Sequence, residues 1–263
     1  MESELGLRLF ERTPEGYFTT QAGEELQVSV ERMEAESISV SRRLAGRDMQ
    51  LSGAIRIALP AVLATYSLID AFAAFKRKHP EITLEILSTY TMPDLTRRDA
   101  DVAIRLSNDP PDDLVGRRVL KLAKAAYVSR EWFAREPDLL SRQELGWIGW
   151  SLDPDTDQWR ADSDFPDVPV NMVVTDPHTT VEAVKAGMGM SILPCFIGDV
   201  EPGLQRVPPG HLTMKTDIWV LTHKDLRKTA RIRLFTKFIA ERLLEQQDLF
   251  EGRKGTEIHS REI

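Results

Sequence analysis

Short strand-like runs alternate with helix-like runs over most of the chain, and this order constrains the fold more than any other feature. Ile55, Ile57 and Leu59 recur at a spacing of two, which predicts a strand over residues 54–59. The next segment, 63–79, has helical spacing and ends before a proline. Because strands that alternate with helices form largely parallel sheets, the sequence predicts an α/β fold.

The same alternation continues toward the C-terminus. Further strands are predicted at 82–87, 101–105, 120–128, 147–150, 170–174, 190–193 and 217–222, and further helices at 93–98, 130–135, 179–186 and 228–245. Ser129 is placed to cap the helix that follows it, and Gly187 and Gly189 close the helix that precedes them. From Gly252 onward the chain is polar and aperiodic, which predicts disorder.

The N-terminal part follows a different pattern. Apolar spacing within residues 1–10 predicts a helix, and a proline and a glycine within 13–16 predict a turn before a β-prone run at 17–19. Thr20 is a good N-cap for a long helix over 21–46. A separate N-terminal unit is therefore expected before the alternating region.

An apolar stripe runs along this long helix at spacings of three and four. It consists of Leu26, Val30, Met33, Ser37, Val40 and Leu44. On a helix of this length, such a stripe predicts pairing with the same helix of a second copy. The alternative is an ordinary amphipathic helix that packs on its own domain. Residues 46–53 have the composition of a short hinge.

Composition excludes several classes of protein. The single cysteine, Cys195, rules out an intrachain disulfide, and no signal-peptide pattern or run of about 18 apolar residues is present. We therefore expect a cytoplasmic location without membrane attachment. The net charge is −7, and up to Asp48 six basic residues face ten acidic ones. The N-terminal unit thus lacks the basic footprint that is typical of a compact nucleic-acid binder.

Two groups of motifs resemble a known family. The runs ELGLRLFERT at 4–13 and PEGYFTTQAG at 14–23 are similar to the second half of the winged helix-turn-helix of LysR-type transcriptional regulators. Four further runs are similar to the effector domain of that family: GAIRIA at 53–58, FAAFKRKHPEI at 72–82, RDADVAIR at 98–105 and AVKAGMGMSILP at 183–194. The resemblance covers nearly all of the chain up to the tail.

The resemblance implies an α/β, two-lobed, periplasmic-binding-protein-like effector domain preceded by a partial winged helix-turn-helix and a long linker helix. The implied division is 1–20 for the remnant of the winged helix-turn-helix, 21–52 for the linker and hinge, 53–250 for the effector domain and 251–263 for a disordered tail. Within the effector domain, lobe one is 53–122 plus 222–250, and lobe two is 123–221. Two crossover strands are expected to join the lobes.

The resemblance also assigns contacts with DNA. Residues at the family's phosphate-contacting positions are Arg8, Arg12, Thr13, Tyr17, Thr19 and Thr20. The pattern commonly has a basic residue at the position of Glu15. The negative charge of Glu15 should repel phosphate, so it weakens the expected contact between the wing and DNA. Met1 falls inside the family's recognition helix, so we expect a native chain longer by roughly 35 to 40 residues. Double-stranded operator DNA is the expected partner of that longer chain.

Ligands of open α/β sheets lie beyond the carboxyl ends of the strands. The residues at those ends are Pro60, Ala61, Val62, Ser88, Thr89, Thr91, Arg105, Trp150, Asp176, His178 and Thr179. They are the candidate effector-binding residues, and the resemblance places a small-molecule site in the cleft between the lobes.

Each candidate has an alternative role. Asp176 can cap a helix whose free N–H groups, at His178 and Thr179, would favour an anion, or it can be a cap that binds nothing. Arg105 can hold a carboxylate in bidentate geometry or form an ion pair with a nearby acid such as Asp101 or Asp109. The hydroxyls of Ser88, Thr89 and Thr91 can contact a ligand or form hydrogen bonds within a turn.

Other kinds of chemistry find little support. The chain contains no GxSxG, HExxH, Walker or GxGxxG motif, so neither catalytic residues nor a cofactor is expected. His178 lacks a second ligand at metal-binding spacing, and Cys195 has the features of a small core residue rather than a redox sensor. Trp147 and Trp150 flank one predicted strand, and core packing is expected for at least one of them.

The sequence therefore predicts a LysR-type DNA-binding regulator, a homodimer or tetramer, controlled by a small anionic metabolite. One alternative is an effector-binding module without autonomous DNA binding, which acts by dimerising with a full-length partner. Another is an α/β enzyme, which rests on the cleft alone.

Overall fold

The structure is a computed structural model that describes residues 2, 6–13, 16–45, 51–88, 100–110, 114–135, 145–150, 159–160 and 162–254. Its strands are β1 (Phe10–Thr13), β2 (Gly16–Thr19), β3 (Gly53–Leu59), β4 (Ile82–Ser88), β5 (Val102–Leu106), β6 (Leu114–Ser129), β7 (Trp147–Gly149), β8 (Val170–Val173), β9 (Ser191–Pro194), β10 (Leu204–Arg206) and β11 (Thr213–His223). Its helices are α2 (Gln21–Ala45), α3 (Ala61–Leu63), the π-helix η1 (Ala64–Leu68), α4 (Ile69–Lys78), α5 (Arg130–Arg135), α8 (Pro177–Lys185), α9 (Cys195–Gly198), α10 (Ala230–Glu245) and α11 (Gln247–Phe250).

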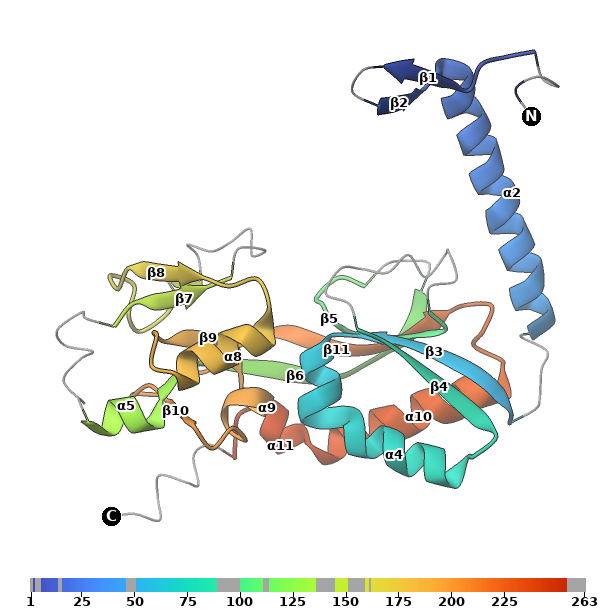
Figure 1. Ribbon diagram of the computed structural model, residues 1–263. Helices are drawn as coiled ribbons and strands as arrows, with labels where there is room; N and C mark the ends of the chain where they lie inside the picture. The colour runs from blue at the N-terminus through green and yellow to red at the C-terminus, as the bar shows by residue number, and fades with distance from the viewer. Residues whose placement is uncertain are drawn as a thin grey trace.

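The N-terminal unit is a hairpin followed by a long helix. Strands β1 and β2 pair antiparallel, and α2 extends away from the rest of the chain (Figure 1). The Thr20 hydroxyl accepts a hydrogen bond from the Gly23 N–H at 3.1 Å, which confirms the predicted cap. The predicted helix over 1–10 is wrong for residues 6–10, because Gly6 adopts a φ of 65° and the chain enters β1 at Phe10, whereas Glu2 is helical.

One mixed sheet forms the body of the molecule. Its strand order is β10-β6-β11-β5-β3-β4, with β9 also on β6. Strand β3 is parallel to β4 and β5, whereas β6, β9, β10 and β11 pair antiparallel. The expectation of largely parallel sheets therefore holds for β3–β4–β5 and for the small β7–β8 sheet, but not for the strands that cross the molecule.

Strand β6 changes its partner along its length. Up to Leu122 it pairs with β11, and from Lys124 it pairs mainly with β9 and β10. The two long strands β6 and β11 therefore pass from the part built on β3–β5 into the part built on β7–β10 (Figure 1). We refer to these two parts as lobe one and lobe two.

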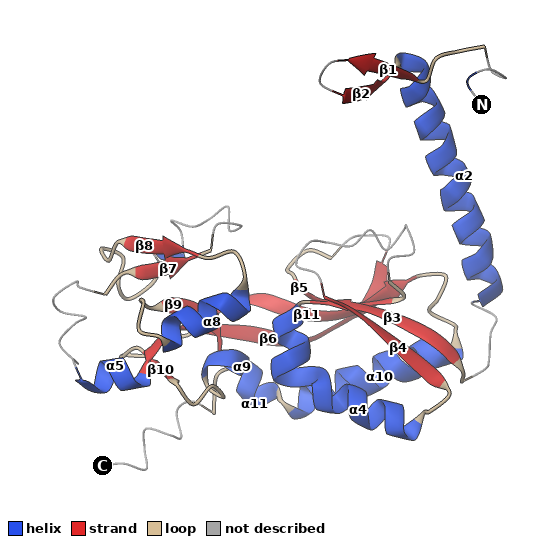
Figure 2. Cartoon of the chain, in the orientation of Figure 1, coloured by secondary structure: helices blue, strands red, loops and turns tan. Residues whose placement is uncertain are grey.

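Helices α4 and α10 cover one face of the lobe-one strands (Figure 2). The buried Phe75 ring packs edge-on against Phe235 at 5.1 Å between ring centroids, which joins the two helices. In lobe two, Trp147 is fully buried and donates its indole N–H to the Phe165 carbonyl at 3.1 Å. Core packing is thus the role of this tryptophan.

Several local features differ from the sequence-based expectations. The helix predicted over 63–79 begins at Ala61 and contains the π-helical turn η1, and β10, α9 and α11 were not expected. The helix predicted at 93–98 lies outside the described residues. Residues 251–254, assigned to the tail by sequence, are described, and Gly252 is buried.

Candidate functional site

The carboxyl ends of the lobe-one strands meet at one edge of the sheet. Leu59 lies opposite Ser88, and Ala58 lies opposite Ala103, so Pro60 and Arg105 are level with each other just beyond. Of the candidates at this edge, Pro60 and Val62 are buried, Ala61 is half-buried and Ser88 is exposed. Thr89 and Thr91 lie outside the residues that the structure describes.

Arg105 places a charged group at this edge. Its side chain comes from β5, where its backbone lies opposite Trp219, and only 5% of the residue is exposed. Burial lowers the pKa of the guanidinium to about 10, because low-dielectric surroundings disfavour the charged form. The group is still protonated at pH 7, so this edge carries a buried positive charge. Asp101, a predicted partner of Arg105, accepts from the backbone N–H of Arg56 at 2.9 Å.

Lobe two presents the ends of β7 and β8. These strands are parallel, and the Val174 N–H donates to the Gly149 carbonyl at 2.9 Å. Trp150 follows β7 and is 39% exposed, so its ring is available at the surface. Asp176 lies on the turn after β8, which puts both candidates at the same edge of the small sheet.

Asp176 caps α8 as predicted, with Pro177 as the first helical residue. Its Oδ1 accepts from the Thr179 N–H at 2.8 Å and from the Thr179 hydroxyl at 2.9 Å. These bonds lower the pKa of the carboxyl, first through the Thr179 N–H. The prediction that the N–H of Thr179 is free for an anion is therefore wrong, because the cap already satisfies it.

His178 is the candidate that joins the two lobes. Its ring stacks on Tyr66, with 5.9 Å between centroids and 24° between planes. Tyr66 lies on η1, which follows directly from the Pro60–Val62 edge of lobe one. The structure therefore brings the start of α8 against the first helical segment of lobe one. Among the described residues no group of three or more His, Cys, Asp or Glu side chains could hold a metal ion.

Four residues at this junction, Tyr66, Glu182, Lys185 and Glu201, were not identified from the sequence. Burial raises the pKa of the Tyr66 phenol, and the negative charge of Glu201 raises it further. Lys185 forms ion pairs with Glu182 at 2.9 Å and with Glu201 at 3.1 Å. The one available signal was that Tyr66 is the only aromatic residue between Pro60 and Phe72.

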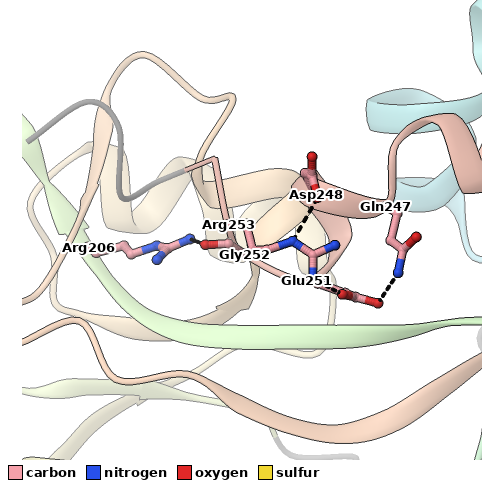
Figure 3. A network of polar contacts seen from close by, with 6 residues as sticks. All are labelled: Arg206, Gln247, Asp248, Glu251, Gly252 and Arg253. Carbon is pink, nitrogen blue, oxygen red and sulfur yellow. Dashed lines mark hydrogen bonds and ion pairs between the residues drawn. The ribbon is translucent and has the colours of Figure 1, made fainter.

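A second polar network ties the C-terminal segment to lobe two (Figure 3). Arg206 donates from Nη2 to Asp199 Oδ2 and to the Gly252 carbonyl, both at 2.6 Å, and from Nε to Asp199 Oδ1 at 2.9 Å. The Tyr127 hydroxyl donates to the same carboxylate at 2.7 Å. This network fastens the chain beyond α11, which follows α10 of lobe one, to strand β10 of lobe two.

Cys195 lies beside this network and is fully buried. Burial raises the pKa of its thiol to about 11, so the side chain is a thiol rather than a thiolate at neutral pH. The interpretation of Cys195 as a core residue rather than a redox sensor is consistent with this environment.

The predicted DNA-contacting residues lie around the β1–β2 hairpin. Arg8 and Thr19 are exposed, whereas the side chains of Arg12, Thr13 and Tyr17 lie outside the described part. The Thr20 hydroxyl donates to the Arg8 carbonyl at 2.7 Å in addition to its capping bond. Thr20 therefore has a structural role at the junction of the hairpin and α2.

Comparison with known proteins identifies a family. Residues 48–244 match the model of the LysR substrate binding domain. The HTH-type transcriptional regulator PtxR of Pseudomonas aeruginosa is 25% identical over 256 residues, covering 92% of this chain and 81% of that protein. No helix in the described part of the chain is long and apolar enough to cross a membrane.

Solved structures share the fold. The full-length virulence activator AphB of Vibrio cholerae superposes with a TM-score of 0.63 at 19% identity, covering 91% of this chain and 86% of that one. CrgA, a LysR-type transcriptional regulator from Neisseria meningitidis, gives a TM-score of 0.64 at 19% identity, covering 92% and 86%. The predicted periplasmic-binding-protein-like architecture of the effector domain is confirmed by this likeness.

Proposed function

We propose, since this chain belongs to the family of LysR-type transcriptional regulators, that a small anionic metabolite binds between its two lobes and controls its action on transcription. The relatives are named as transcriptional regulators, so the assigned role is regulatory rather than catalytic. A metabolite that contacts both lobes would favour one arrangement of the lobes. Helix α2 would transmit this change in arrangement to the N-terminal DNA-binding unit.

The observation that carries the anionic class of ligand is the buried charge of Arg105. A guanidinium that stays protonated at the carboxyl edge of β3 and β5 favours a negatively charged group there. The Tyr66–His178 stack supplies a junction of the lobes next to the same edge. We keep all the strand-end candidates as proposed lining of the site, with Asp176 as the cap that fixes the position of His178. The division of the effector domain into lobes at 122–123 and 221–222 belongs to this proposal.

Replacing Arg105 with methionine is expected to weaken the binding of carboxylates. A lost charged hydrogen bond costs about 1.5–3 kcal/mol, which is roughly a 10- to 150-fold rise in Kd. The measurement is thermal unfolding of the full chain with a panel of small mono- and dicarboxylates. A ligand at about 100 times its Kd contributes about 2.7 kcal/mol, which raises the Tm of the wild type by roughly 5–10 °C.

Two controls accompany this experiment. The neutral amides of the same compounds should give no shift, and Arg56→Met should leave the shift unchanged, because Arg56 is exposed and paired with Glu85. If no carboxylate shifts the wild type, the anionic class is refuted. If the amides shift it equally, the ligand is not selected by charge.

The helix α2 supports assembly of two copies. Of the stripe residues whose side chains are described, Leu26 is half-buried, Val30 is 46% exposed and Met33 is 73% exposed. Apolar residues on one face of a long helix that extends from its domain favour pairing with a second such helix. We therefore propose a homodimer, or a tetramer built from such dimers, held in part by α2.

Replacing Met33 with glutamate should weaken the dimer, because a charge would enter the paired face. We expect a loss of about 1.5–3 kcal/mol of dimerisation free energy, the value of one buried methionine. Sedimentation equilibrium measures it. Val28 is the matched control, since it is 51% exposed and apolar but lies on the opposite side of α2. Equal effects of Met33→Glu and Val28→Glu would refute the proposed pairing face.

A second candidate function is an effector-binding module without DNA binding of its own, which acts by dimerising with a full-length partner. The acidic balance of the first 48 residues favours it. The two candidates differ in their affinity for operator DNA, where the proposed phosphate contacts are Arg8, Arg12, Thr13, Tyr17 and Thr19. The module predicts no operator binding above that of random DNA at about 0.1 M salt.

A further inference from the structure

Positive charge collects at one end of lobe one. The segments 76–81 and 224–237 together hold nine cationic residues and two acidic ones, a net charge of +7 in a chain whose net charge is −7. The cationic residues are Lys76, Arg77, Lys78, Lys224, Arg227, Lys228, Arg231, Arg233 and Lys237. We call this surface the basic edge. The rest of the chain must therefore carry a net charge of −14, so the distribution is strongly asymmetric.

Packing brings the two segments together. Phe75 of α4 contacts both Phe235 and Phe238 of α10, at 5.1 and 5.3 Å between ring centroids. Arg231 donates from Nε to the Ala54 carbonyl at 3.1 Å, which joins the start of α10 to the start of β3. The end of α4, the start of α10 and the start of β3 consequently lie at the same end of the molecule (Figure 1).

At least four of the nine cations are not neutralised within the part of the chain that the structure describes. Lys224, Arg227, Lys228 and Arg233 are exposed and form no ion pair with any residue that the structure describes. Of the two acids, Asp225 lies 3.4 Å from His223. The first turn of α10 contains no acidic residue, so its cations oppose the helix dipole and cost stability. The side chains of the four exposed cations Lys224, Arg227, Lys228 and Arg233 hold no other part of the described chain in place, which indicates a role at the surface.

The lack of exposed apolar residues on the basic edge limits the class of partner that it can bind. None of the exposed large hydrophobic residues of the described chain lies in 76–81 or 224–237. A helix that lies on a membrane buries aromatic or aliphatic side chains beside its cations, and a protein interface has an apolar centre. An exposed set of cations without apolar anchors fits a sugar-phosphate backbone, whose contacts are mainly electrostatic.

We propose that the basic edge binds the phosphate backbone of double-stranded DNA without regard to sequence. The inference rests on the proposed function, because the DNA in question is the DNA that the N-terminal unit is proposed to bind. Strand β3 begins at Gly53, eight residues after α2 ends at Ala45, so the basic edge is the part of the effector domain that the linker enters. DNA that is bound by the N-terminal unit is therefore present at high local concentration near the basic edge.

The test is binding of the full chain to a 30-base-pair duplex of random sequence, followed by fluorescence anisotropy between about 0.03 and 0.2 M salt. The logarithm of the affinity should fall linearly with the logarithm of the salt concentration. The double variant Arg227→Ala with Lys228→Ala should reduce that slope by up to about 1.8, since each lost phosphate contact removes about 0.9. It should weaken random and operator-bearing duplexes by the same factor.

The matched control removes the same charge elsewhere. Lys121 and Lys254 are exposed and lie outside the basic edge, so their double alanine variant should keep the wild-type slope. Equal slopes for the two double variants, or no binding of the wild type at the lowest salt, would overturn the inference. Competition by polyglutamate as strong as that by DNA would overturn it too, in favour of an acidic protein.

This assay separates the inference from the proposed function. Random duplex contains no operator and no metabolite is added, so loss of operator selectivity or of ligand binding does not affect its outcome. A regulator whose basic edge is idle would bind its operator with the same salt slope in both double variants.

Discussion

Replacing Arg206 with alanine is expected to destabilise the protein by about 3–5 kcal/mol, measured as the free energy of unfolding in urea. The side chains of Arg206 and Asp199 are only 12% and 4% exposed. Removing the guanidinium leaves the Asp199 carboxylate buried, with the Tyr127 hydroxyl as its remaining donor among the bonds described. A buried charge without its counter-ion is the costliest result of breaking an ion pair.

The same variant also frees the C-terminal segment. The Gly252 carbonyl loses the bond from Arg206 Nη2, which holds the chain beyond α11 against β10 (Figure 3). The stack of Phe250 on Phe196, with 4.7 Å between ring centroids, would then hold this segment without the Arg206 bond. We expect limited proteolysis after residue 250 to accelerate in Arg206→Ala under native conditions.

Arg253 provides the matched control in the same network. It contacts Asp248 at 2.7 Å and also pairs with Glu251, but its side chain is 54% exposed. Exposed ion pairs contribute about 0–1 kcal/mol, so Arg253→Ala should change the free energy of unfolding by no more than that. Similar losses in the two variants would show that burial does not set the energy of this network.

The structure shows which properties of this chain are local enough to predict. The strand at 54–59 and the cap at Thr20 follow from side-chain alternation and from one hydroxyl, and both are confirmed. The same is true of the start of α8 at Asp176 and Pro177. In each case the physical cause lies within about four residues of the element that it determines.

Long-range contacts could not be predicted in this way. The Tyr66–His178 stack joins residues 112 positions apart, and the Arg206–Gly252 bond joins residues 46 apart. Competition between local groups also decided some outcomes. Thr179 has a helix-start N–H that the sequence left open to a ligand, but the Asp176 carboxylate three residues earlier already occupies it.

The basic edge illustrates the same limit. The charge run 224–237 is visible in the sequence, but its union with Lys76–Lys78 depends on the antiparallel packing of α4 on α10. Arg105 is a further case, since its place after an alternating strand is local but its burial depends on the whole sheet. Sequence therefore indicated which residues are candidates, and tertiary packing decides what each can contact.

Replacing Gly189 with alanine is expected to cost about 3 kcal/mol of unfolding free energy, at the upper end of the range for overpacking a core. A Cβ at this buried position would lie 2.6 Å from the Gly146 carbonyl oxygen and 2.9 Å from Ile148 Cγ1. The same carbonyl accepts from the Met190 N–H at 3.0 Å, so it cannot move away without breaking the contact between β7 and the start of β9. Trp150, at the end of β7, would be displaced along with that strand.

Gly187, two residues earlier, is the matched control because it is required for a different reason. Its φ of 76° lies in the left-handed region, and the atoms nearest to an added Cβ would be those of Trp132, from 3.4 Å. Gly187→Ala should therefore cost about 1 kcal/mol through backbone conformation alone. At roughly 2–4 °C per kcal/mol, the Tm of Gly189→Ala should fall below that of Gly187→Ala by about 4–8 °C. A reversed order would mean that the backbone between β7 and β9 yields to the added methyl group more easily than the turn at Gly187 does.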